Sequence, residues 1–195
     1  MSARPPFRQP PLSMSLPDWV EGRVRDAPPC TSDEARMRLV VDLSRANVEH
    51  ATGGPFGAAV FEQGCAQPLA VGVNRVEPLA NACAHAEVIA LMAAQARVGS
   101  YSLRRTDAPP CELFTSCAPC AMCLGAALWS GVTRIVCGAT REDALALGFD
   151  EGPVFDASWR YLEARGVEIA HGVLAREARD VLAAYVARGG LIYNA

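Results

Sequence analysis

Two short segments of the chain carry side chains that could bind a metal ion and move protons. The first is His85-Ala86-Glu87, and the second is Pro119-Cys120-Ala121-Met122-Cys123, whose first cysteine lies 35 residues after the histidine. Cys120 and Cys123 are three positions apart, so they share one face of a helix. Two thiolates and one imidazole supply three ligands, the number that a catalytic zinc ion uses while its fourth position stays open for water. The spacing therefore predicts a zinc site formed by His85, Cys120 and Cys123.

Glu87 lies beside this expected site without being one of its ligands. In the middle of a helix, residues two positions apart diverge, so His85 and Glu87 can face the same ion only at a helix start. Both segments are predicted to begin helices, and two helix N-termini that converge would stabilise the thiolates through their partial positive charges. We therefore expect Glu87 to take a proton from the zinc-bound water and to hand it to a substrate ring nitrogen and to the leaving amine.

Other interpretations use the same cysteines. A structural zinc ion held by four cysteines would recruit Cys117 or Cys111, but it would leave the histidine and the glutamate without a role. An iron–sulfur cluster could add Cys117 to the Cys120/Cys123 pair, although no cysteine follows at the spacing of a fourth ligand. A zinc-stabilised scaffold without catalysis is a third alternative, and the adjacent carboxylate argues against it because a structural metal does not require a proton carrier.

The elements that must position these segments follow from hydrophobic periodicity and from boundary residues. A capping-box pattern, with Thr31 as the N-cap and Glu34 at the third helical position, opens the folded region. We expect helices over residues 31–50, 84–97, 119–130 and 176–188, and strands over 57–61, 69–73, 111–115, 133–138 and 167–170. The first two strands form a hairpin, and the later strands alternate with helices. This order predicts an α/β fold, a three-layer α/β/α sandwich with a mixed central sheet.

The first 30 residues are expected to lie outside this domain. They contain seven of the fourteen prolines, which is typical of an extended arm. Trp19 and Val20 could anchor the arm to the surface of the protein. Residues 31–195 are then expected to form a single domain, which the length of 195 residues favours.

The composition excludes several classes of protein. With 51% hydrophobic residues and a net charge of −3, the chain has enough apolar residues for one core and is not disordered throughout. All 18 basic residues are arginines, which excludes enzymes that use a lysine Schiff base or a P-loop lysine. A mildly acidic chain is also a poor partner for nucleic acid, and no apolar stretch is long enough for a membrane span. No signal peptide accompanies the eight cysteines, so we expect reduced thiols and a cytoplasmic location.

Beyond these two segments, the chain resembles the bacterial guanine deaminases of the cytidine-deaminase-like superfamily. A His-x-Glu followed by Pro-Cys-x-x-Cys is the signature of zinc-dependent nucleobase deaminases. The resemblance runs from about residue 35 to the C-terminus and includes Gly53-Gly54-Pro55-Phe56-Gly57-Ala58, Ala84-His85-Ala86-Glu87, Thr115-Ser116-Cys117, Trp129 and Gly148-Phe149-Asp150-Glu151. One departure is Ala118, because the family commonly has an acidic residue before Pro-Cys.

The resemblance implies a role for each matching position. It implies zinc ligands at His85, Cys120 and Cys123, proton transfer by Glu87 and Glu151, and substrate contacts at Phe56, Asn74, Ala86, Trp129 and Tyr193. Asn74 would hydrogen-bond the base, and Phe56 and Trp129 would line the slot for the purine ring. Tyr193 would gain its role in a homodimer whose C-terminal residues reach the partner's active site. There are simpler alternatives: the two slot aromatics could be core residues, Asn74 a turn residue and Glu151 a solvated loop carboxylate.

The expected reaction is therefore the zinc-dependent hydrolytic deamination of a free nucleobase, with guanine and water giving xanthine and ammonia. The same chemistry could act on another small aminated ring (an ammeline-like s-triazine, cytosine or a nucleoside), because only the pocket distinguishes these substrates. A tRNA adenosine deaminase would need a basic surface, and Arg97, Arg104 and Arg105 are too few to form one. The expected partners are a small-molecule nucleobase and a second copy of the chain, with no nucleic acid and no membrane.

Overall fold

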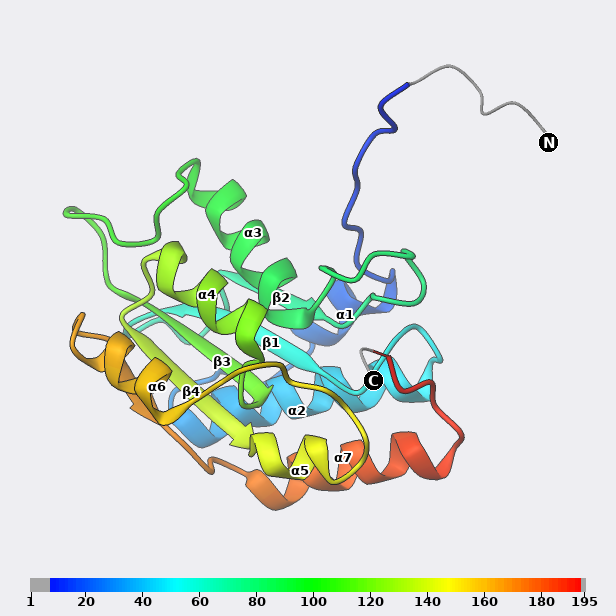
Figure 1. The fold of residues 1–195 in the computed structure, drawn as a ribbon. Helices are drawn as coiled ribbons and strands as arrows, with labels where there is room; N and C mark the ends of the chain where they lie inside the picture. The colour runs from blue at the N-terminus through cyan, green and yellow to red at the C-terminus, as the bar shows by residue number, and fades with distance from the viewer. Residues whose placement is uncertain (1–7, 194–195) are drawn as a thin grey trace.

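A mixed β-sheet forms the centre of the protein (Figure 1). The computed structural model describes residues 8–193. Within them the strands are β1 (Gly57–Glu62), β2 (Ala70–Val73), β3 (Cys111–Cys117), β4 (Arg134–Ala139) and β5 (Glu168–Ala170), in the order β2-β1-β3-β4-β5. β1 pairs antiparallel with β2 and with β3, whereas β3, β4 and β5 run parallel. The predicted hairpin and mixed sheet are therefore confirmed.

Helices cover both faces of this sheet (Figure 1). α3 (Ala86–Val98) and α4 (Ala121–Ser130) lie on one face, and α2 (Asp33–Glu49) and α7 (Ala175–Ala187) lie on the other. Each face has its own cluster of buried apolar side chains, and β3 is buried at every position because it runs between the two clusters. The expected three-layer α/β/α sandwich is confirmed.

The starts of α3 and α4 bear most directly on function. His85 is the N-cap of α3 and Cys120 is the N-cap of α4, and both residues have extended backbone angles. Each helix ends at a glycine in the left-handed region, Gly99 with φ +66° and Gly131 with φ +84°, a conformation that costs glycine little. Both helix starts lie within two residues of the predicted positions, so the metal-binding segments do begin helices.

Other boundaries differ from the prediction. The N-cap of α2 is Ser32 and not Thr31, because the Ser32 backbone is extended and its hydroxyl accepts a hydrogen bond from the Ala35 amide at 3.2 Å. Part of the arm is helical, as α1 (Trp19–Arg25), and Val20 on it is only 1% exposed within the core. Val20 thus anchors this segment, although its backbone is not extended.

Two short helices lie between β4 and β5 where no helix is expected from the sequence. These are α5 (Arg141–Leu145) and α6 (Asp156–Glu163), with five and eight residues. Helices of this length have little stability of their own, so tertiary packing decides whether they form. None of the helices formed by residues 8–193 has the length and apolar character of a membrane span.

A buried ion pair joins α2 to the central strand. The Arg36 guanidinium donates to the carboxylate of Glu112, and it also lies 4.9 Å from the centroid of the Phe61 ring. Both charged residues are buried, with 8% and 5% of their surface exposed. Removing one charge of such a pair leaves the other desolvated without its partner, which is more destabilising than removing both.

We expect Arg36→Leu to lower the free energy of unfolding by about 3 kcal/mol, because the Glu112 carboxylate would stay buried without its closest partner. The double variant Arg36→Leu/Glu112→Leu should recover most of that loss. Urea unfolding followed by circular dichroism measures both changes, with Arg38→Leu, an exposed arginine on the same helix, as the matched control. Equal losses in the free energy of unfolding for Arg36→Leu and Arg38→Leu would contradict this account.

Candidate active site

The N-termini of α3 and α4 bring three possible metal ligands together. The ligand atoms of His85, Cys120 and Cys123 all lie within 4.8 Å of one another. Nδ1 of His85 is 3.5 Å from Sγ of Cys120 and 3.5 Å from Sγ of Cys123. A tetrahedral zinc ion with bonds of about 2.3 Å to sulfur and about 2.0 Å to nitrogen separates these atoms by about 3.5 Å. The donor set and its spacing therefore fit zinc.

The surroundings of Cys120 favour the thiolate form, which is the form that binds a metal ion. A hydrogen bond with Cys123, and a further one with His85, lower the pKa of Cys120 to about 4. The same interaction, together with burial, raises the pKa of Cys123. Both sulfurs lie in the first turn of α4, where the partial positive charge of the helix N-terminus also favours thiolate.

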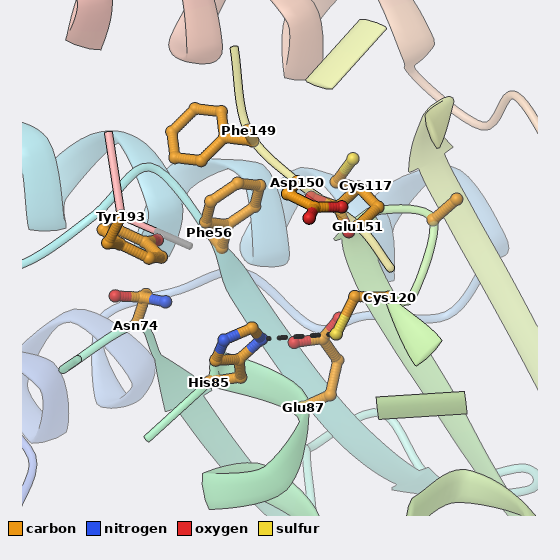
Figure 2. Close-up of a pocket in the computed structure, with 11 residues that line it drawn as sticks. Phe56, Asn74, His85, Glu87, Cys117, Cys120, Phe149, Asp150, Glu151 and Tyr193 are labelled. Atoms are coloured by element: carbon orange, nitrogen blue, oxygen red, sulfur yellow. Dashed lines mark hydrogen bonds between the residues drawn. The ribbon is translucent and has the colours of Figure 1, made fainter. Parts of the chain in front are cut away.

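Two carboxylates that are not in the ligand cluster line the cavity in front of it (Figure 2). Glu87, in the first turn of α3, is 7% exposed, and burial raises the pKa of its carboxyl group. Glu151, which precedes α6, is 8% exposed, and burial raises its pKa to about 8. Its backbone oxygen accepts a hydrogen bond from the Ala121 amide at 3.0 Å, which ties this loop to the start of α4. A carboxyl group whose pKa is near neutrality is suited to general acid–base work.

The opposite side of the cavity carries polar atoms without hydrogen-bond partners. Oδ1 of Asn74 accepts a hydrogen bond from the Val76 amide at 3.2 Å, but its Nδ2 is buried without a partner. The Tyr193 hydroxyl oxygen is also buried without a partner. Phe56 stands between them and the loop of Glu151, with its ring edge-on to Phe149 at 5.1 Å (Figure 2). Unpaired buried donors in a cavity are the groups that a bound ligand would satisfy.

The structure brings together most of the residues that the sequence singles out. The cavity-lining set includes Phe56, Asn74, His85, Glu87, Cys120, Glu151 and Tyr193. Trp129 is not in this set, because its side chain is 80% exposed near the end of α4, away from the cavity. Ala86, the first residue of α3, is fully buried in the core and does not line the cavity either. Tyr193 lies in the cavity of its own chain, whereas the resemblance implied a contact with a partner's site.

The sequence analysis assigns no role to four residues that line the cavity: Cys117, Ala118, Phe149 and Asp150. All four lie in or beside the segments that carry the resemblance, next to positions with an assigned role, and this placement is the signal that could have found them. Sγ of Cys117 donates to the Thr140 carbonyl oxygen at 3.4 Å and does not belong to the ligand cluster, so the structure gives no support to a four-cysteine site. Ala118 puts a methyl group at the cavity wall where the family commonly has an acidic side chain.

Comparison with known proteins identifies the class. Residues 30–139 match the family described as the cytidine and deoxycytidylate deaminase zinc-binding region, and this match spans more than half of the chain. The protein therefore belongs to this deaminase family and is a zinc hydrolase that acts on a C–N bond. The predicted zinc cofactor is confirmed by this match together with the ligand cluster.

Three similar proteins indicate the kind of deaminase that this chain resembles. The chain is 36% identical over 122 residues to guanine deaminase of Bacillus subtilis, which covers 63% of this chain and 74% of that protein. It is 41% identical to a solved guanine deaminase from Nitrosomonas europaea, with a TM-score of 0.86 and coverage of 93% of this chain and 99% of that one. A structure of NE0047 with 2,6-diaminopurine is 43% identical, with a TM-score of 0.86 and coverage of 93% and 96%. The resemblance to bacterial guanine deaminases is confirmed.

Metal analysis of protein prepared without added metal should find one zinc ion per chain. Cys123→Ser should reduce this content well below one, because it removes a ligand from the cluster. Cys65→Ser, which changes an exposed thiol outside the cluster, is the matched control and should retain zinc. A preparation that contains iron and sulfide but no zinc would contradict the assignment.

Proposed function

We propose that the protein deaminates free guanine to xanthine and ammonia. The observation that carries the proposal is the arrangement of the cavity, in which the ligand cluster and two buried carboxylates face the unpaired amide of Asn74. The kinship with guanine deaminases supports guanine as the base. A flat purine ring with donors and acceptors along its edge is a suitable ligand for this set of groups.

The residues of this chain would divide the work as follows. His85, Cys120 and Cys123 would hold the zinc ion, which when bound supplies Lewis-acid activation of the attacking water. Glu87 accepts a proton from that water and delivers it to the ring nitrogen beside the reacting carbon. Once the water oxygen has bonded to the carbon that bears the amino group, Glu87 would take the remaining proton from that oxygen and pass it to the amine. The C–N bond then breaks and ammonia leaves.

Other residues that line the cavity would bind the base. Nδ2 of Asn74 can donate to an acceptor on the ring, because its Oδ1 is already occupied by the Val76 amide. Glu151 accepts a ring N–H and, with a pKa raised to about 8, can hold or release a proton near neutral pH. The Phe56 ring contributes apolar surface to the slot.

An ammonia-release panel over guanine, adenine, cytosine, ammeline and their nucleosides tests this assignment, and we expect guanine to react fastest. Glu87→Gln should reduce the rate on guanine by about 10²–10⁴-fold, because the amide cannot carry the protons. Its zinc content should stay unchanged, since Glu87 is not a ligand.

Glu163→Gln, an exposed glutamate on α6, is the matched control for this variant and should keep the wild-type rate. Turnover of another ring with guanine inert would refute guanine as the substrate and leave the mechanism intact. Full activity of Glu87→Gln would refute the mechanism.

We also propose that the protein is a homodimer whose C-terminal tails exchange between copies. Met92, Tyr101 and Trp129 support a dimer, because they expose large apolar side chains beside one groove over α3 and α4. Gly189 and Gly190 precede the tail and would let Tyr193 leave the cavity of its own chain and enter the same place in the partner. The cytoplasmic location stays a prediction from the thiol content.

Trp129→Glu should convert a dimer into a monomer, because it would place a charge in the apolar contact. Sedimentation equilibrium measures this change as a fall from twice the chain mass of 20.7 kDa to a single copy. Leu12→Glu, at an 85% exposed position in the arm, is the control and should leave the mass unchanged. A wild-type protein that sediments as a monomer would overturn the homodimer proposal.

A further inference from the structure

Asn47 on α2 is fully buried, and both hydrogens of its amide point to the region of the cavity. Nδ2 donates to the backbone oxygen of Asn74 at 2.9 Å and to that of Gly54 at 2.8 Å. These two carbonyl groups belong to different segments, one after β2 and one before β1, and each segment supplies a cavity residue. Asn47 does not line the cavity itself, so any effect on the ligand must pass through these two segments.

The orientation of this amide is set by a chain of hydrogen bonds that begins on α1. Nε1 of Trp19 donates to Oγ1 of Thr52 at 3.1 Å, and Oγ1 of Thr52 donates in turn to Oδ1 of Asn47 at 2.8 Å. An indole N–H can only donate, so the Thr52 hydroxyl accepts from it and its single hydrogen is directed to the amide oxygen. With Oδ1 held in this way, Nδ2 has to face the two carbonyl groups.

The packing around these hydrogen-bonded residues leaves little room for the side chains to move. The Trp19 ring stacks on His50 with centroids 5.3 Å apart and planes 18° apart. Any Cβ on Gly53 would lie 1.9 Å from the Asn74 carbonyl oxygen, so the turn approaches Asn74 as closely as glycine allows. The backbone N–H of Asn74 also donates to the Phe56 carbonyl oxygen at 3.0 Å. A shift of either carbonyl group would therefore displace Phe56, Asn74 or both.

We infer that Trp19, Thr52 and Asn47 are positioning residues for the nucleobase, and that helix α1 supports the substrate side of the active site. Trp19 lies outside residues 30–139, the region matched by the deaminase family. The inference rests on the proposed function for its kinetic readout. The four hydrogen bonds of this network join Trp19, Thr52 and Asn47 to the backbone beside the cavity residues Phe56 and Asn74, so we expect the network to act on binding of the base.

Thr52→Val and Trp19→Phe test the inference with small changes of shape. Thr52→Val removes the hydroxyl between the indole and the amide, and Trp19→Phe keeps an aromatic ring on His50 but removes the N–H. We expect each to raise KM for guanine by about five- to tenfold, with kcat changed by less than about twofold and zinc content unchanged. A structural defect alone would reduce the fraction of active enzyme, which lowers the apparent kcat and leaves KM unchanged.

Matched controls come from the same protein. Thr133→Val removes a hydroxyl that donates to the Cys111 carbonyl oxygen, and Trp159→Phe alters a tryptophan that contacts His171; none of these residues is in the cavity lining. Both should retain the wild-type KM. An unchanged KM in Thr52→Val and Trp19→Phe, or a KM rise of the same size in the controls, would overturn the inference.

A second readout separates this inference from the identity of the substrate. The Val76 amide donates to Oδ1 of Asn74, so its hydrogen exchange, followed by NMR, reports the position of Asn74 without any ligand. We expect faster exchange in Thr52→Val and unchanged exchange in Thr133→Val. If wild-type protein is inert toward guanine while Val76 behaves as expected, the proposed function fails and the positioning network stands; wild-type exchange in Thr52→Val refutes the network.

Discussion

The fold of this protein serves one geometric requirement, which is that an imidazole and two thiols meet at tetrahedral spacing. Nδ1 of His85 lies 3.5 Å from each sulfur although the two segments are 35 residues apart in sequence. The strand order places the start of α3, after the hairpin, next to the start of α4, after the central strand. Both helices begin with a ligand as the N-cap, so their positive ends support the same site.

Burial gives the remaining groups their chemical properties. The carboxyl groups of Glu87 and Glu151 have raised pKa values because the cavity desolvates them, and the Asn74 amide lacks a partner because protein and not water surrounds it. In these low-dielectric surroundings a misplaced polar group costs free energy, because a buried group without a partner cannot form a hydrogen bond with water instead. This is the physical reason for a supporting network behind Asn74 that reaches as far as Trp19.

Much of the fold follows from local patterns. The hairpin, the alternating strands and helices, and the helix stops at Gly99 and Gly131 are all marked by residues that act within a few positions of one another. The patterns fail where packing decides. The sequence around α1 is rich in proline, and yet α1 packs onto the core through Val20. The helices α5 and α6 are short, so tertiary packing decides whether they form.

The sequence by itself predicted that His85, Cys120 and Cys123 come together with Glu87 beside them, because their spacing on two helix starts is a local property and because few chemistries use that set of residues. It could not decide the positions of Trp129 and Tyr193, one exposed at 80% and the other inside the cavity of its own chain, since the same aromatic side chain is stable in either place. Nor does any motif mark the contact of Asn47 with Asn74, 27 residues away. Long-range contacts of this kind depend on how the helices and loops pack, and only the tertiary structure specifies that packing.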